Sequence, residues 1–169
     1  VASQIVEFFV ERVKNLFKDL GIRYDVIDAV LNNNLDDISD IHTRALELNR
    51  WLQKDELVEM LTAFNRVATL AEKATTDIVK EDLLKEDAEI KLYNGFKEIK
   101  SNVKSLLLDK KYNEALDAFA TLRPLVDNLF DNVMVMDKDE AIKENRLGLL
   151  KQIYSTMLTI CDLSKIVYK

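Results

Sequence analysis

Glycine and proline are almost absent from this chain, since three Gly and one Pro occur in 169 residues. Strands joined by tight turns depend on these residues, because glycine supplies positive φ angles and proline fixes turn geometry. Their scarcity therefore favours helices that are joined by short polar connections. With 48% hydrophobic and 32% charged residues, the chain is large and apolar enough for one buried core, and short for two.

Apolar residues recur at intervals of three and four along most of the chain, which is the spacing of one helical face. This pattern is clearest over residues 87–108 and also predicts helices over 3–20, 38–52, 56–73 and 113–122. A short helix capped by Asp25 and ended by the run Asn32–Asn34, a helix starting at Pro124 and a long last helix over 139–166 complete the set. We therefore predict a single all-α domain over residues 1–169, a helical bundle of about seven or eight helices.

The charge is distributed unevenly along the chain. Residues 1–84 hold 10 Lys/Arg against 16 Asp/Glu, whereas residues 85–169 hold 14 of each. The net charge of −6 argues against indiscriminate binding to nucleic acid or to an anionic membrane. Because Arg makes forked contacts to phosphates and bases, a specific nucleic-acid contact would be expected from Arg. The stripe of Lys97, Lys100 and Lys104 has a simpler interpretation as a solvated helix face.

No residue combination of catalytic use is visible in the sequence. His42 is the only histidine, which excludes a His-based triad or a two-His metal site within this chain. Cys161 is the only cysteine, which excludes an internal disulfide and fits a reducing compartment. No apolar run approaches the length of a membrane span, and no signal peptide is visible. We expect a non-catalytic, cytoplasmic binding module without a membrane partner, cut from a longer chain because it starts at Val1.

Residues 121–151 form the most unusual stretch of the sequence. This stretch contains the only proline, places Arg123 and Asp127 four residues apart, and repeats an Asp-Asn pair at 127–128 and 131–132. Spacing alone does not separate an i,i+4 ion pair from an RNA-facing cluster here. The following apolar run contains Met134 and Met136, which we interpret as flexible core filler rather than as part of a partner groove.

Three segments, taken in order, resemble the C-terminal anticodon-binding domain of bacterial glycyl-tRNA synthetase beta subunits. This domain is similar to the DALR-type helical domain of arginyl-tRNA synthetases. The segments are Asp25–Leu31 with Arg44–Leu46, Leu122–Met136, and Glu144–Leu150. The resemblance covers nearly the whole chain. Where the family has Lys-Arg-Val, this chain has Asn65-Arg66-Val67, so Arg66 matches and Asn65 departs.

The resemblance implies a DALR-type fold within an enzyme that joins glycine to its tRNA with ATP and Mg²⁺. In that enzyme type the active site lies on a separate alpha subunit, and the parent is an alpha2beta2 tetramer. The expected partners are therefore glycine tRNA at its anticodon loop, the alpha subunit and the rest of the beta subunit. ATP and Mg²⁺ would belong to the catalytic subunit. No catalytic, cofactor-binding or metal-binding residue is expected in this chain.

The candidate anticodon contacts are Arg, Asn and Asp side chains. Loop bases are read on their edges, while Arg and Lys hold the phosphates. Arg suits guanine, and Asp accepts from the amino group of cytosine, which forms the last two bases of a glycine anticodon. The candidates are Arg12, Arg23, Arg66, Arg123, Asp131, Asn132, Asn145 and Arg146.

Two other functions remain open from the sequence. Each candidate side chain could instead form a structural ion pair or a helix cap. The chain could then be a helical protein-docking module for the assembly of synthetase subunits. It could also be the anticodon-binding domain of an arginyl-type synthetase, although the run Asp131–Met136 argues against that alternative.

Overall fold

The computed structural model describes residues 1–32 and 35–168, and over these residues it contains eight α-helices, two short 3-10 turns and no strand. The elements are α1 (Ala2–Asp19), α2 (Tyr24–Val30), α3 (Ile38–Trp51), α4 (Leu57–Ala71), η1 (Glu81–Leu83), α5 (Asp87–Leu108), α6 (Tyr112–Ala120), α7 (Arg123–Asn132), α8 (Glu140–Ile160) and η2 (Leu163–Lys165). This confirms the predicted all-α architecture. None of the described helices is long and apolar enough to cross a membrane.

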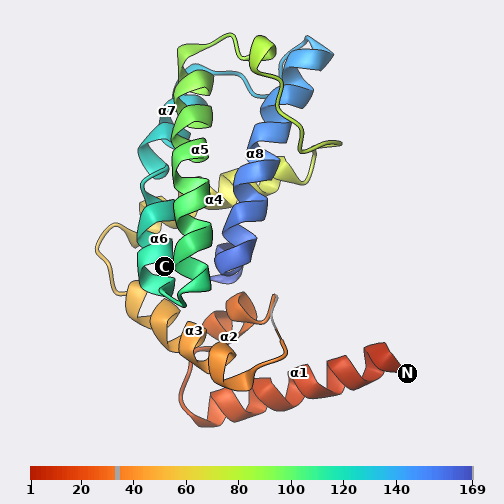
Figure 1. Cartoon of the computed structure of the whole chain (residues 1–169), viewed down its shortest axis with the longest axis vertical. Helices are drawn as coiled ribbons and strands as arrows, with labels where there is room; N and C mark the ends of the chain where they lie inside the picture. Colours follow the sequence, from red (N-terminus) through yellow and green to blue (C-terminus); the bar gives the residue numbers. More distant parts are fainter. Residues whose placement is uncertain (33–34, 169) are drawn as a thin grey trace.

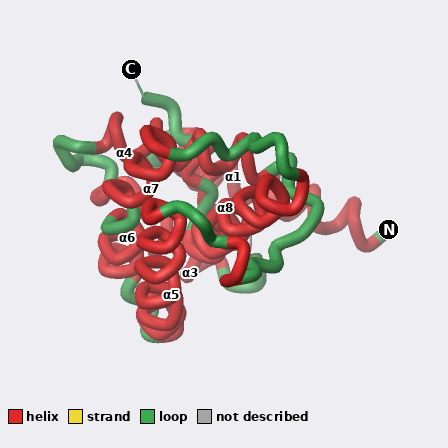
Figure 2. Tube along the Cα trace, turned by 90° about the horizontal axis from the view of Figure 1, so that it is seen from above, coloured by secondary structure: helices red, strands yellow, loops and turns green. Residues whose placement is uncertain are grey.

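The helices α4 to α8 form a bundle, and α1 to α3 lie at one end of it (Figure 1). Helix α4 packs along α8 and against α7, and α5 contacts α6, α7 and α8. Contacts of α3 with α6, and of η2 with α2 and α4, join the two groups. The N-terminal part of α1 projects away from the other helices (Figures 1 and 2).

One apolar cluster runs through both groups of helices. Its largest buried side chains include Phe17 of α1, Trp51 of α3, Phe64 of α4 and Phe119 of α6. The Phe64 and Phe119 rings lie 4.7 Å apart between centroids. Because each buried side chain of this size contributes about 1.5–3 kcal/mol, this core holds α4 and its neighbours in a fixed arrangement.

Two predictions about helix ends are wrong. The last helix ends at Ile160 rather than near residue 166, because Cys161 takes an extended conformation and η2 follows. Asp25 does not cap α2: the N-cap is Arg23, and Asp25 is buried in the first turn, where it accepts from the backbone N–H groups of Val26 and Val167. Of the asparagine run expected to end this helix, residues 33–34 lie outside the described residues.

Candidate nucleic-acid interface

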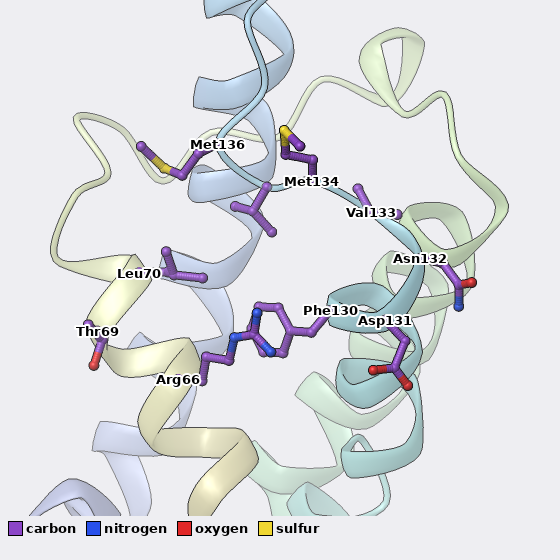
Figure 3. A pocket seen from close by; sticks show the side chains of 10 residues that line it. Arg66, Thr69, Leu70, Phe130, Asp131, Asn132, Val133, Met134 and Met136 are labelled. Atoms are coloured by element: carbon purple, nitrogen blue, oxygen red, sulfur yellow. The ribbon is translucent and has the colours of Figure 1, made fainter.

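A groove of about 660 Å³ opens between the second half of α4 and the segment that follows α7 (Figure 3). Helix α4 contributes one wall, and the end of α7 with residues 133–136 contributes the other. The lining residues are Arg66, Thr69, Leu70, Phe130, Asp131, Asn132, Val133, Met134, Val135 and Met136. The structure therefore brings three of the eight candidates, Arg66, Asp131 and Asn132, to one site.

Arg66 and Phe130 meet in the middle of the groove (Figure 3). The Cζ atom of Arg66 lies 4.2 Å from the centroid of the Phe130 ring. Arg66 is exposed and Phe130 is half-buried, so the ring supports a guanidinium that remains open to solvent. A cation–π contact at an exposed site contributes about 0.5–1 kcal/mol, enough to restrict the guanidinium without hiding its N–H donors.

Asp131 and Asn132 form the exposed end of α7 beside this pair. The Nδ2 group of Asn132 donates to the carbonyl oxygen of Asn128 at 3.0 Å and to its Oδ1 at 2.8 Å. Among the described residues no ion pair of Asp131 occurs, so its carboxylate remains an open acceptor. The groove thus places a fixed guanidinium donor and a carboxylate acceptor on facing elements.

The interpretation of the two methionines as core filler is wrong. Met134 is 70% exposed and Met136 is 44% exposed, whereas Val133 and Val135 are buried. Val133 ends α7 in an extended conformation, with φ −128° and ψ 130°. All four residues line the groove, but the two valines are buried in the core cluster, whereas the two methionines project from it. This places a flexible apolar surface beside the polar residues.

Arg146 is buried and holds the segment that forms one wall of the groove. Its Nε donates to Oε1 of Glu89 at 2.5 Å, and its Nη1 donates to the Met134 carbonyl oxygen at 2.8 Å and to Oδ2 of Asp137 at 2.9 Å. Burial lowers the pKa of Arg146, but hydrogen bonds and charge from Glu89 and Asp137 raise it above its ordinary value. At 4% exposure, Arg146 positions the groove and does not line it.

Asn145 is also buried and has a comparable positioning role. Its Oδ1 accepts from the backbone N–H of Lys80 at 2.7 Å, and its Nδ2 donates to the Lys80 carbonyl oxygen at 3.1 Å. This pair of bonds fixes the connection between α4 and α5 against α8. Asn145 and Arg146 are therefore not among the exposed candidates that line the groove.

The remaining three candidate arginines, Arg12, Arg23 and Arg123, lie outside the groove. Arg123, at the start of α7, has its Nε 3.2 Å from Oδ2 of Asp127, an ion pair that lacks hydrogen-bond geometry at Nε. Arg23 donates to Asp25 at 2.6 Å and to the Val167 carbonyl oxygen at 3.0 Å. Arg12 is exposed on α1, with its Cζ 5.7 Å from the Phe8 ring centroid.

Sequence reasoning missed Phe130, Thr69 and Leu70, and it assigned Met134 and Met136 to the core. Residues 133–136 are apolar at every position, so no alternation of apolar and polar residues indicated which of these side chains would be exposed. Among residues 1–32 and 35–168, no group of three or more His, Cys, Asp or Glu side chains could hold a metal ion.

Comparison with known proteins places this chain in a family. The chain belongs to the DALR anticodon binding domain family, whose model matches residues 60–168 and thus every residue that lines the groove. The chain is also 74% identical over its full length to the glycine–tRNA ligase beta subunit of Clostridioides difficile (strain 630). It is 41% identical over 99% of its length to the protein of that name from Desulforamulus reducens, and 36% identical over 96% to that from Alteromonas mediterranea. It spans about a quarter of the length of these relatives.

Proposed function

We propose that this chain binds the anticodon loop of glycine tRNA as part of the beta subunit of a glycine–tRNA ligase. Membership in the anticodon-binding family and the names of the relatives support this proposal. The observation that carries it is the Arg66–Phe130 pair in an open groove beside the Asp131 carboxylate. The relatives are named for glycine, which favours glycine tRNA over the arginine alternative.

The groove offers what an unstacked loop base requires. Such bases stack on aromatic rings or on guanidinium planes and are read on their edges by polar side chains. The guanidinium of Arg66, which lies over the Phe130 ring, provides the stacking surface. Asp131 provides an acceptor for the amino group of cytosine, and the exposed Met134 and Met136 provide apolar contacts for the base or the ribose. The phosphates would be held by lysine and arginine side chains outside the groove.

The proposal extends to the larger enzyme. ATP and Mg²⁺ would be used on the alpha subunit. This chain would bind the anticodon loop and contribute affinity and selectivity for glycine tRNA. The partners would be the alpha subunit and the remainder of the beta subunit in an alpha2beta2 tetramer in the cytoplasm. Because the intact enzyme would hold other parts of the tRNA as well, this chain alone would bind more weakly than the whole enzyme.

The test is fluorescence anisotropy with two labelled hairpins, a glycine anticodon stem-loop and the same hairpin with exchanged anticodon bases. We expect tighter binding of the glycine hairpin and a loss of this preference in Arg66→Ala. The matched control is Arg50→Ala, because Arg50 is 74% exposed on α3 and pairs only with Glu47 among the described residues. Equal binding of both hairpins by the unmodified chain would contradict anticodon reading.

A second candidate function, docking on another protein surface, is favoured by α1. Ile5, Phe8 and Leu16 of this helix are 63%, 64% and 47% exposed, although all three are large and apolar. The dependence of binding on salt concentration distinguishes RNA binding from protein docking. RNA binding through phosphates weakens steeply as the salt concentration rises, whereas apolar docking changes little. A complex with the remainder of the beta subunit that survives high salt and is lost in Phe8→Ser would support docking.

A further inference from the structure

A second surface of the molecule combines lysines with hydroxyl groups. Helices α5 and α8 are in contact, and they lie side by side in Figure 1. Two hollows of about 390 and 500 Å³ open between them and share Lys100, Thr156 and Thr159. Because they share these residues, we call the two hollows together the α5–α8 trough. No residue of this trough lines the groove that contains Arg66.

The two walls of the trough differ in chemistry. Lys100 and Lys104 are exposed on α5 and lie one helical turn, about 6 Å, apart along its axis. Helix α8 supplies polar side chains that recur at helical spacing, namely Gln152, Ser155, Thr156 and Thr159. The α5 wall carries these two lysines beside the apolar Val103, Leu107 and Leu108. On the α8 wall the Thr159 hydroxyl donates to the Thr156 carbonyl oxygen at 2.6 Å and Nε2 of Gln152 donates to the Asp77 carbonyl oxygen at 2.5 Å, which leaves the exposed Ser155 hydroxyl as the available donor of this wall among the described residues.

The lysines of α5 fall into two groups that a sequence pattern does not distinguish. Lys91 pairs with Asp87 at 2.6 Å, and Lys97 pairs with Glu81 at 3.1 Å. For Lys100 and Lys104, no ion pair occurs within the part of the chain that the structure describes; the Nζ of Lys100 lies 5.7 Å from the Phe96 ring centroid. The two lysines that line the trough are thus the two whose charge is not neutralised by a carboxylate.

The charge of the trough contrasts with that of the whole chain. The chain carries a net charge of −6, yet Asp77 is the single carboxylate among the residues that line the trough. Arg44 also lines it, although its guanidinium is engaged by Asp40 at 3.1 Å. Two uncompensated lysines one helical turn apart, facing the exposed Ser155 hydroxyl on α8, are an arrangement that holds phosphate oxygens, because ammonium and hydroxyl groups donate to phosphate without reading bases.

We propose that the α5–α8 trough is a second RNA contact, which binds the phosphodiester backbone of the stem while the Arg66 groove takes the loop. This inference rests on the proposed function for its ligand. It assigns the two tasks of recognition to separate surfaces. The groove selects the bases, and the trough contributes affinity that does not depend on the anticodon sequence.

The test compares Lys100→Ala/Lys104→Ala with Lys91→Ala/Lys97→Ala in the full chain. The two double variants remove the same charge from the same helix. We measure the affinity for the glycine hairpin and for the exchanged hairpin as a function of salt. We expect the trough variant to weaken both hairpins by a similar factor, about tenfold at low salt. We expect it to reduce the slope of log K against log salt by roughly 1.5, since each lost phosphate contact removes about 0.7–0.9.

The outcomes separate this inference from the proposed function. If both double variants bind like the unmodified chain, or weaken binding equally, the trough proposal is overturned, whatever Arg66→Ala does. If the trough variant weakens both hairpins but the unmodified chain never prefers the glycine hairpin, the trough stands and anticodon reading fails. If the unmodified chain binds neither hairpin at low salt, both proposals are overturned. Unfolding curves for each variant exclude a loss of fold as the cause of weaker binding.

Discussion

The Nε atom of Arg146 lies 2.5 Å from Oε1 of Glu89, and the two side chains are 5% and 0% exposed. This contact joins the start of α5 to the first half of α8. Glu89 also accepts from the backbone N–H groups of Lys85 and Glu86, so the carboxylate closes the N-terminal turn of α5 while it neutralises the arginine. The same guanidinium holds the carbonyl oxygen of Met134, which connects the buried pair to the wall of the groove.

The first prediction concerns this buried pair. Removing one partner leaves the other as an uncompensated buried charge, so Arg146→Ala should lower the free energy of unfolding by about 3–5 kcal/mol. Arg50→Ala removes an arginine from an exposed pair and should cost less than about 1 kcal/mol. Urea unfolding followed by circular dichroism measures both. Equal shifts of the urea midpoint in the two variants would show that the pair is not buried in solution.

The second prediction concerns Gly148, which lies where the connection between α4 and α5 crosses α8. A Cβ atom at this position would lie 2.8 Å from the carbonyl oxygen of Ile78 and 3.4 Å from that of Thr76. These atoms belong to the backbone, which cannot move aside as the end of a flexible side chain can. Gly148→Ala should therefore lower the free energy of unfolding by about 1–3 kcal/mol, although alanine is the better helix former by about 1 kcal/mol.

Gly95 provides the matched control for this substitution. It also lies inside a helix, but a Cβ atom there would meet the end of the flexible Leu125 side chain at 2.6 Å. Gly95→Ala should leave the melting temperature unchanged or raise it, because the leucine can move and the helix propensity improves. If both glycine variants melt alike in calorimetry, the close approach of the α4–α5 connection to α8 is wrong.

The third prediction is a pH dependence that arises from Asp25. Burial raises the pKa of this carboxyl, but hydrogen bonds from Arg23 and from the backbone of Val167 and Val26 lower it below the ordinary value of 3.8. A lowered pKa in the folded state means that the unfolded state binds protons first as the pH falls. The stabilisation is therefore complete above about pH 4 and is lost as the pH falls through the lower folded pKa.

Asp25→Asn isolates this contribution. The variant should be less stable than the unmodified chain at pH 7, and the difference in the free energy of unfolding should shrink below pH 3.8. Asp28→Asn is a suitable control, because Asp28 lies on the same helix and is 43% exposed. A difference that stays constant down to pH 2 would contradict a lowered pKa for Asp25.

The helices were predictable because their signals are local. The apolar stripe of α5 and the three-to-four spacing of apolar residues in its neighbours identify each helix from a few adjacent residues. The ends of α2 and α8 were not predictable, since they depend on partners distant in sequence. Asp25 binds Val167, and the backbone N–H of Asp162 donates to the Ala29 carbonyl oxygen at 2.8 Å, so the chain after α8 leaves its helical path to meet α2.

The candidate site was predictable only in part, because residue types are local information and the packing that brings them together is not. Arg66 and Asp131 could be named from their residue types and from the family resemblance, but their meeting in one groove follows from the packing of α4 against α7. Asn145 and Arg146 were indistinguishable from surface residues, because a polar side chain near the start of a helix gives no sign of burial. Their partners, Lys80 and Glu89, lie more than fifty residues earlier in the chain.

The last prediction tests the alternation that forms the groove wall. Met134 is 70% exposed, so Met134→Ala should change the free energy of unfolding by less than about 0.5 kcal/mol. If the groove takes the anticodon loop, the same variant should weaken binding of the glycine hairpin several-fold, because it removes an apolar contact. Val135 is 6% exposed, so Val135→Ala should instead lower the free energy of unfolding by about 2 kcal/mol. Denaturant unfolding and hairpin anisotropy on both variants separate the two faces, and a Met134→Ala variant that loses as much stability as Val135→Ala would place the methionine in the core after all.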